Sequence, residues 1–351
     1  MHSVCTDRIG RLLRYLIATT LIGMSVATAR AAGLQFLYVP ADAGEPALTG
    51  AVWYPCRAPV PQVKVGPVRL EASKNCRLAG SAHPLIVISH GYAGKWTSHH
   101  DTAETLANAG FVVAAINHPI DSGPNLSRAD TVSILVERPR DIKRLIDYML
   151  HRWPDRAKLD PGRIGFFGFS RGGYTGLVLI GANPDLHACL VLCPPTNNPP
   201  ICDQIRANRD LPAAFPHDPR IKAAVIADPA FGPMFTRASL LAATVPVQLW
   251  ASQWSGEDKE AGVTPEYVEA IGNNLPNKPD FHLVAHAAHY AFLAPCSPQP
   301  AARFPHICKD HPGFDRAAFH RQFDAAVLAF FGQHLGHHGA SPVTTDSKVP
   351  R

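Results

Sequence analysis

The segment 168–172, GFSRG, has the pattern G-x-S-x-G, and its flanks give that pattern chemical meaning. An apolar run, 163–169, precedes the serine and a helix-forming run follows it, so the serine lies at a sharp turn from a strand into a helix. Small residues two positions before and after the serine let the strand and the helix approach closely. The N-terminus of the helix, beneath the hydroxyl, favours negative charge. We predict that Ser170 is a nucleophile.

A serine hydroxyl is a weak nucleophile until a base takes its proton. In proteins with this kind of turn, the acid and then the histidine follow the serine along the chain. His289 fits this order best, because it follows the last predicted strand, 281–285. The small residues Ala287 and Ala288 allow the histidine to approach the serine closely. His286 is its main rival.

Two aspartates are candidates for the acid that orients this histidine. Asp228 follows the predicted strand 221–227 directly, so its side chain is expected at the catalytic end of the sheet. Asp258 lies in the loop after the next strand, 245–251. Either position allows a carboxylate to reach the far nitrogen of the imidazole and fix its tautomer. We favour Asp228, because the charged neighbours of Asp258 are typical of a solvated loop, and Asp258 remains the alternative.

The oxyanion formed during acyl transfer needs two preorganised N–H donors. We expect one from the backbone of Arg171, which follows the nucleophile. The other is expected from the backbone of Tyr92, in the loop after the predicted strand 85–89. His90 is expected to brace that loop.

The sequence predicts neither a metal nor a cofactor for this chemistry. The segment 99–101, His-His-Asp, contains ligand-type side chains on a predicted helix. Adjacent helical residues point in different directions, so these three cannot easily share one ion. A metal-dependent hydrolase is therefore the weakest of the alternatives.

Apolar runs alternate with amphipathic segments from Pro84 onward. Buried strands are expected at 85–89, 111–116, 163–169, 221–227, 245–251 and 281–285. Helices are expected at 99–108, from Pro139 onward, from Tyr174 to Ile180, and at 314–335. This alternation predicts an α/β fold with a mostly parallel central sheet and helices on both faces.

Two stretches rich in proline interrupt the alternation, 184–219 and 295–312. Both are placed to overhang the strand ends, where sites form in open α/β sheets. We expect 184–219 to be an insertion or lid and 295–312 to contribute to a pocket wall.

The first residues have the features of a secretory signal peptide. Three arginines precede an apolar run, 15–29, and small residues follow it up to Ala32. The run is short for a membrane span, which needs about 20 residues. We therefore predict a signal peptide at 1–32, a periplasmic or secreted protein without a stable membrane span, a folded domain at 33–336 and a disordered tail at 337–351.

Seven of the eight cysteines lie beyond that leader. Export makes disulfides the expected state. The local pairs Cys56–Cys76 and Cys296–Cys308 are expected, together with Cys202 bonded to either Cys189 or Cys193. One cysteine is left over.

Charge does not favour nucleic acid as a partner. The 351 residues carry a formal net charge of +5, and 17% of them are charged. Lysine and arginine are scattered rather than clustered, so no basic surface for nucleic acid is predicted.

Four segments carry a resemblance to a known group of proteins: PLIVISHGYAG, AGFVVAAINHP, RIGFFGFSRGGYTG and IKAAVIADPAFG. They resemble the platelet-activating-factor acetylhydrolase-like branch of the α/β hydrolases, and also bacterial proteins described as predicted dienelactone hydrolases. The resemblance extends from about residue 34 to 335. It implies the α/β-hydrolase fold with lid-like insertions, and hydrolysis of esters without a cofactor.

The two branches of the resemblance differ in their acid. In the acetylhydrolases it follows the strand after the elbow helix, as Asp228 does, whereas in dienelactone hydrolases it follows the next strand, as Asp258 does. Dienelactone hydrolases use a cysteine nucleophile in the cytoplasm, and this chain departs from them in both respects.

These observations predict a serine hydrolase that cleaves a small-molecule or polymeric carboxylic ester through an acyl-enzyme intermediate. The alternative is a catalytically silent exported binding protein with the same fold. A lid that seals the serine would favour that alternative.

Overall fold

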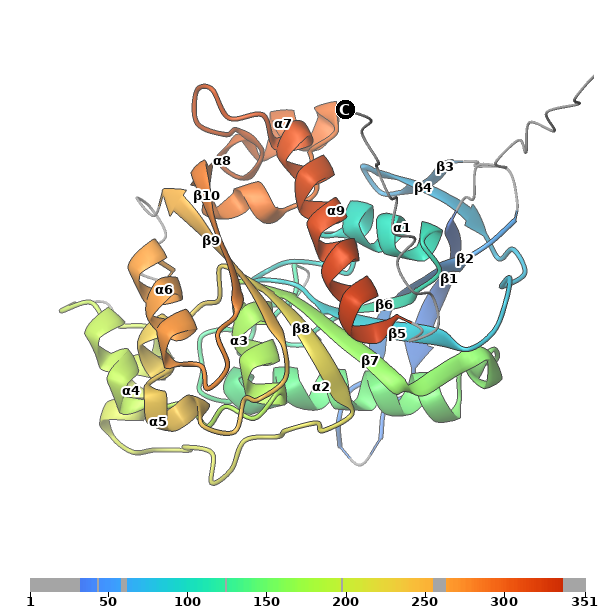
Figure 1. Ribbon diagram of the computed structural model, residues 1–351. Helices are drawn as coiled ribbons and strands as arrows, with labels where there is room; N and C mark the ends of the chain where they lie inside the picture. The colour runs from blue at the N-terminus through green and yellow to red at the C-terminus, as the bar shows by residue number, and fades with distance from the viewer. Residues whose placement is uncertain are drawn as a thin grey trace, which may run out of the picture.

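The computed structural model describes residues 32–336 apart from 43, 58–61, 124, 197 and 255–262. Its strands are β1 Ala32–Val39, β2 Leu48–Pro55, β3 Gln62–Val65, β4 Val68–Lys74, β5 His83–Ser89, β6 Val112–Asn117, β7 Leu159–Phe169, β8 Ile221–Ala227, β9 Val247–Trp254 and β10 Asp280–Ala288. They form a ten-stranded sheet in the order β10-β9-β8-β7-β5-β6-β2-β1-β4-β3 (Figure 1). The predicted signal peptide, except Ala32, and the predicted tail lie outside the described residues.

The part of the sheet from β6 to β10 is entirely parallel. Every residue of β5 is buried, as expected of a strand covered on both faces. At one side, β2 joins β6 in antiparallel register and continues the sheet through β1. The prediction of a mostly parallel central sheet is confirmed, although the sequence pattern did not reveal β1 to β4.

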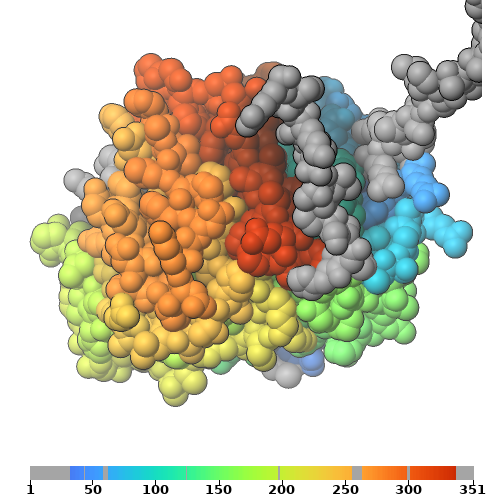
Figure 2. Space-filling view, in the orientation of Figure 1, coloured from blue at the N-terminus to red at the C-terminus, as the bar shows by residue number. Residues whose placement is uncertain are grey.

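Helices cover both faces of the sheet, also as predicted (Figure 1). Their bounds are α1 His100–Asn108, α2 Ile134–His151, α3 Arg171–Leu179, α4 Pro200–Arg206, α5 Arg237–Leu240, α6 Pro265–Asn274, α7 Pro298–Arg303, α8 Pro305–Cys308 and α9 Arg316–Leu335. Buried side chains of α2, α3 and α6 form one core cluster with the sheet, and those of α1 and α9 form a second. In the space-filling view, the red C-terminal segments lie in the middle of one face, between the orange segments and the blue N-terminal strands (Figure 2).

Helix α2 begins at Ile134, so the prediction that Pro139 opens this helix is wrong. Proline inside a helix lacks the N–H that would bond to the carbonyl four residues earlier. Here that carbonyl belongs to Leu135, and it accepts a hydrogen bond from the Tyr174 hydroxyl at 3.3 Å. A side chain of α3 thus replaces the missing donor, which explains why the helix continues through the proline.

The described cysteines form the disulfides Cys56–Cys76, Cys193–Cys202 and Cys296–Cys308. The first and third pairs are as predicted, and the second is one of the two alternatives given for Cys202. Cys189 is buried and unbonded. Its burial raises the pKa of the thiol to about 12, so this cysteine stays in its neutral form.

No helix in the described ranges is both long and apolar enough to cross a membrane.

Candidate active site

Ser170 lies at the turn between β7 and α3, with a left-handed backbone (φ 56°) that non-glycine residues rarely adopt. Helix α3 begins directly after it, three residues earlier than predicted. The backbone N–H of Ser170 donates to Ala227 O at 2.9 Å, and its carbonyl accepts from Ala230 N–H at 3.0 Å. These bonds fix the strained turn to the end of β8, so the position of the hydroxyl is set by the sheet.

The glycines of the motif are required by close backbone contacts. A Cβ at Gly168 would lie 2.2 Å from Gly172 O, and a Cβ at Gly172 would lie 1.9 Å from Ser89 O. Any side chain at either position would therefore separate α3 from β7 or β5. These close contacts explain why the motif has small residues on both sides of Ser170.

His289 and Asp228 are brought together although 61 residues separate them in the chain. Asp228 follows β8, and His289 is the first residue of the short 3-10 helix His289–Phe292 after β10. His289 Nδ1 lies 3.1 Å from Asp228 Oδ2, and both side chains are buried. The imidazole packs against the ring of Phe169, at 4.5 Å between centroids, next to the serine.

Ser252 on β9 is a second partner of the same carboxylate. Its backbone N–H donates to Asp228 Oδ1 at 2.7 Å, and its hydroxyl donates to Asp228 Oδ2 at 2.5 Å. These two bonds orient the carboxylate toward His289. Sequence reasoning missed Ser252, because the pattern of the strand contains nothing that marks this serine.

The competing candidates are placed differently. His286 is exposed, and its backbone N–H donates to Gln253 Oε1 at 2.8 Å. Asp258 lies outside the described residues. Within the described residues, Asp228 is the carboxylate that reaches His289.

The loop after β5 passes directly over the serine. A Cβ at Gly91 would lie 3.1 Å from Ser170 Cβ, so this approach depends on glycine. His90 braces the loop: its Nδ1–H donates to Gly91 O at 2.6 Å, and its Nε2 accepts from His118 N–H at 3.2 Å. Burial, and then the nearby Arg138, hold the pKa of His90 well below its usual value, so the ring stays neutral.

Arg138 is a fully buried residue of α2 that sequence reasoning missed. Its guanidinium pairs with Asp121 at 2.7 Å and donates to His90 O and to Ser89 Oγ, the latter at 3.1 Å. It thus holds the loop over Ser170 from below. The signal was present, because an arginine four residues before Ile142 lies on the apolar face of the helix.

Arg171 follows Ser170, and its side chain contacts two other segments of the chain. Its guanidinium pairs with Asp130 at 3.0 Å and lies over the ring of Tyr92, 4.3 Å from the centroid. The two residues predicted to supply oxyanion donors therefore lie side by side next to Ser170.

A cavity of about 770 Å³ opens at these residues. Ser170, His289, Tyr92 and Arg171 all line it. The rest of its lining is mainly apolar, which suits an uncharged organic ligand.

A sequence profile of the family described as "Platelet-activating factor acetylhydrolase, isoform II" matches residues 38–128. Over its whole length the fold is similar to a ferulic acid esterase from Streptomyces cinnamoneus, with a TM-score of 0.63 and 21% sequence identity. That alignment covers 92% of this chain and 95% of the other. The chain has the fold of the α/β hydrolases.

The curated relatives with detectable sequence similarity are named as ester hydrolases. A cutinase, est1, from Thermobifida alba is 34% identical over 116 residues, which is 32% of this chain and 36% of the relative. A bis(hydroxyethyl) terephthalate hydrolase from Streptomyces coelicolor is 31% identical over 109 residues, 31% of this chain and 32% of the relative. The chain spans about a third of the length of the curated relatives that it matches.

Two segments that follow one another at a distance in the chain contribute many of the residues that line the cavity. The insertion wall consists of the lining residues Cys189, Leu192, Cys193, Pro199, Ile201 and Cys202. The C-terminal wall consists of the lining residues Tyr290, Leu293, Phe304, His306 and Ile307. Both fall in or beside the stretches 184–219 and 295–312, which were expected to overhang the strand ends.

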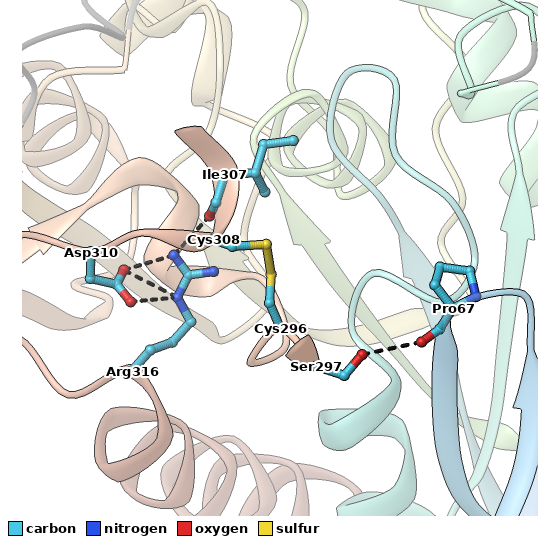
Figure 3. Close-up of a disulfide and its surroundings, with 7 residues drawn as sticks. All are labelled: Pro67, Cys296, Ser297, Ile307, Cys308, Asp310 and Arg316. Carbon is cyan, nitrogen blue, oxygen red and sulfur yellow. Dashed lines mark hydrogen bonds and ion pairs between the residues drawn. A yellow bond between two sulfur atoms is a disulfide. The ribbon is translucent and has the colours of Figure 1, made fainter. Parts of the chain in front are cut away.

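The C-terminal wall is fixed at several points (Figure 3). The disulfide Cys296–Cys308 closes it on itself. Arg316 of α9 pairs with Asp310 at 2.7 Å and donates to Ile307 O at 2.8 Å. These contacts attach the wall to the C-terminal helix, so its pocket-lining side chains are held in place.

Proposed function

We propose that this protein hydrolyses carboxylic esters, with Ser170 as nucleophile, His289 as general base and Asp228 as the acid that orients it. The observation that carries the proposal is the His289–Asp228 pair, 3.1 Å apart, at the cavity that Ser170 lines. A strained serine at a strand-to-helix turn supports it.

In this mechanism the Ser170 hydroxyl oxygen attacks the ester carbonyl carbon while His289 takes its proton. The backbone N–H groups of Tyr92 and Arg171 are proposed to stabilise the oxyanion. The tetrahedral intermediate collapses, His289 protonates the departing alkoxide, and an acyl-serine remains. A water molecule, deprotonated by His289, then attacks this acyl group. The second tetrahedral intermediate that forms then collapses, which releases the carboxylic acid and restores the serine.

The cavity supports a substrate larger than an acetate ester. Its volume of about 770 Å³ exceeds what a short acyl chain fills, and aromatic residues line it. The exposed side chains of Tyr92 and Phe304 stand at its edge and would contact groups that extend beyond it. The cutinase, terephthalate ester and ferulate ester activities named for similar proteins support small or polymeric esters as the substrate class.

A silent binding protein remains the alternative from another class. A lid closed over the serine would favour it, but the cavity extends to Ser170 and His289. We therefore favour the enzyme.

We also propose that the protein works outside the cytoplasm, in the periplasm or as a secreted protein. The leader at 1–32 supports this location. The three disulfides support an oxidising compartment.

Turnover of p-nitrophenyl esters of increasing chain length tests the activity. We expect Ser170→Ala to lower kcat by a factor of about 10⁴ or more, because the nucleophile is removed. Ser98→Ala is the matched control, since Ser98 also lines the cavity and has no chemical role in the proposal. An inactive wild type on every ester, or a Ser170→Ala variant as active as the wild type, would refute the proposal and favour the binding protein.

A further inference from the structure

Helices α1 and α9 bring three ligand-type side chains together on the face of the sheet away from α2 and α3. Asp101 belongs to α1, and His320 and Asp324 lie one turn apart on α9. One ligand atom from each of the three lies within 4.8 Å of the others. His320 and Asp324 are buried, and Asp101 is half-buried. The group is separate from the triad and takes no part in the mechanism above.

The orientation of His320 leaves one ring nitrogen for this group. Its Nε2–H donates to Ala291 O at 2.8 Å, so Nδ1 is the ring nitrogen that faces the two carboxylates. Nδ1 lies 2.7 Å from Asp101 Oδ2. Metal-binding histidines commonly use their second nitrogen in this way, to bond to a backbone carbonyl.

The two carboxylates also need a positive charge. Both oxygens of Asp101 are buried, and Oδ2 faces Nδ1 of His320 at 2.7 Å. Asp324 Oδ1 accepts from the Thr102 hydroxyl at 2.6 Å, which fixes its rotamer. Buried carboxylates at this separation are stable only if they are protonated, paired with a cation or bound to a metal.

We propose that Asp101, His320 and Asp324 bind one divalent metal ion of the zinc type. An imidazole nitrogen with two carboxylates is a donor set that zinc accepts, with water as a fourth ligand. Calcium and magnesium prefer oxygen ligands alone, so the histidine argues against them. The ion would join α1 to α9 and hold the carbonyl of Ala291, two residues after His289.

The neighbouring histidines are engaged elsewhere. His99 packs against the rings of Phe167 and Phe169, at 5.0 Å and 5.5 Å. His100 Nδ1 lies 3.3 Å from Glu104 Oε1. Asp101 instead lies close to two ligand-type side chains of a helix more than 200 positions later in the chain.

Zinc content after metal loading tests the site without any measurement of turnover. The protein is stripped with EDTA, given a small excess of Zn²⁺, desalted and submitted to elemental analysis. We expect one zinc per chain in the wild type and none in Asp324→Asn, which keeps the size of the side chain. The matched control is His337→Gln with His338→Gln, because histidines near the C-terminus can also capture zinc, and this variant should keep its ion.

Co²⁺ provides the second measurement. We expect visible absorption bands of a low-coordinate site in the wild type, absent from His320→Gln. Circular dichroism shows whether each variant folds; if Asp324→Asn does not, Asp101→Asn takes its place. A wild type that retains no zinc and gives no cobalt bands would overturn the proposal in favour of a protonated His320 paired with Asp101. Equal zinc in the wild type and in every folded ligand variant would also overturn it.

Discussion

Three donors meet the carboxylate of Asp228: both donor groups of Ser252 and the imidazole of His289. Ser252 fixes the plane of the carboxylate, and the carboxylate in turn fixes which nitrogen of His289 carries the proton. A neutral amide of the same shape would reverse one donor–acceptor pair and favour the wrong tautomer.

We therefore expect Asp228→Asn to lower kcat for a soluble ester by a factor of about 10³ to 10⁴, with little change in KM, since the geometry survives and the tautomer does not. Steady-state kinetics of purified protein measure both constants. Asp258→Asn is the matched control and should keep nearly full activity. If Asp258→Asn loses the activity and Asp228→Asn keeps it, the assignment of the acid is reversed.

The residues of the site differed in how far the sequence could predict them. Ser170 was predictable because its motif, a strand and a helix all had to coincide. His289 was predictable from its place after the last strand. The choice between Asp228 and Asp258 was open, because spacing alone does not show which loop reaches the imidazole. The structure supplies the contact to Asp228, and Asp258 lies outside the described residues.

At the scale of elements, each wall of the cavity carries its own disulfide. Cys193–Cys202 closes the insertion wall, and both of its cysteines line the cavity. Cys56–Cys76 instead joins β2 to the segment after β4, and neither of its cysteines lines the cavity. Removing one disulfide or the other therefore distinguishes an effect on the shape of the pocket from an effect on the general stability of the fold.

Replacing Cys193 and Cys202 together by serine should raise KM for long-chain or aromatic esters several-fold. Turnover of an acetate ester should stay near that of the wild type, because the triad lies on other elements. Kinetics with an ester series at a temperature where all variants are folded measure this. Cys56→Ser with Cys76→Ser is the control, and a similar KM profile for the two double variants would contradict a role for the insertion wall in substrate binding.

Elements that stand out in the sequence as apolar runs could be predicted. Strands β5, β6 and β8 and the second half of β7 are largely buried and read as mainly apolar runs. Strand β1 was not predicted, because it has apolar residues on both faces and the pattern does not show that Phe36 and Tyr38 are exposed while Leu37 and Val39 are buried. The start of α2 was predicted wrongly because the proline rule considers only the helix itself, whereas the donor that replaces the missing N–H comes from Tyr174 on α3.

At the scale of the whole molecule, the alternation of strands and helices was enough to predict the class of the fold, but not the strands at the edge of the sheet. The antiparallel addition of β2 to β6 depends on contacts between residues 60 to 68 positions apart, from Trp53 with Val113 to Thr49 with Asn117. No local pattern contains that pairing. The leader at 1–32 and the tail at 337–351 lie outside the described residues, and both remain predictions.

Stability toward acid also belongs to the whole molecule, and His90 provides a way to measure it. Both ring nitrogens of this buried residue are used by the neutral form, one as donor to Gly91 O and one as acceptor from His118 N–H. Protonation would abolish the second bond and place a charge beside Arg138. The pKa of His90 in the folded protein accordingly lies well below the usual value of 6.5, with burial as the main cause.

The unfolded chain therefore takes up a proton at His90 below pH 6.5 and the folded protein does not, so the free energy of unfolding falls as the pH falls from this value. One such proton contributes a slope of about 1.4 kcal/mol per pH unit. Denaturant unfolding at several pH values between neutrality and pH 5 should show a slope shallower by about that amount in His90→Gln, which cannot titrate. The buried histidines that do not contact His90 are common to both proteins and cancel in the difference. Parallel curves for the two proteins would show that His90 is protonated in the folded protein. The conclusion that a neutral His90 braces the loop over Ser170 would then be wrong.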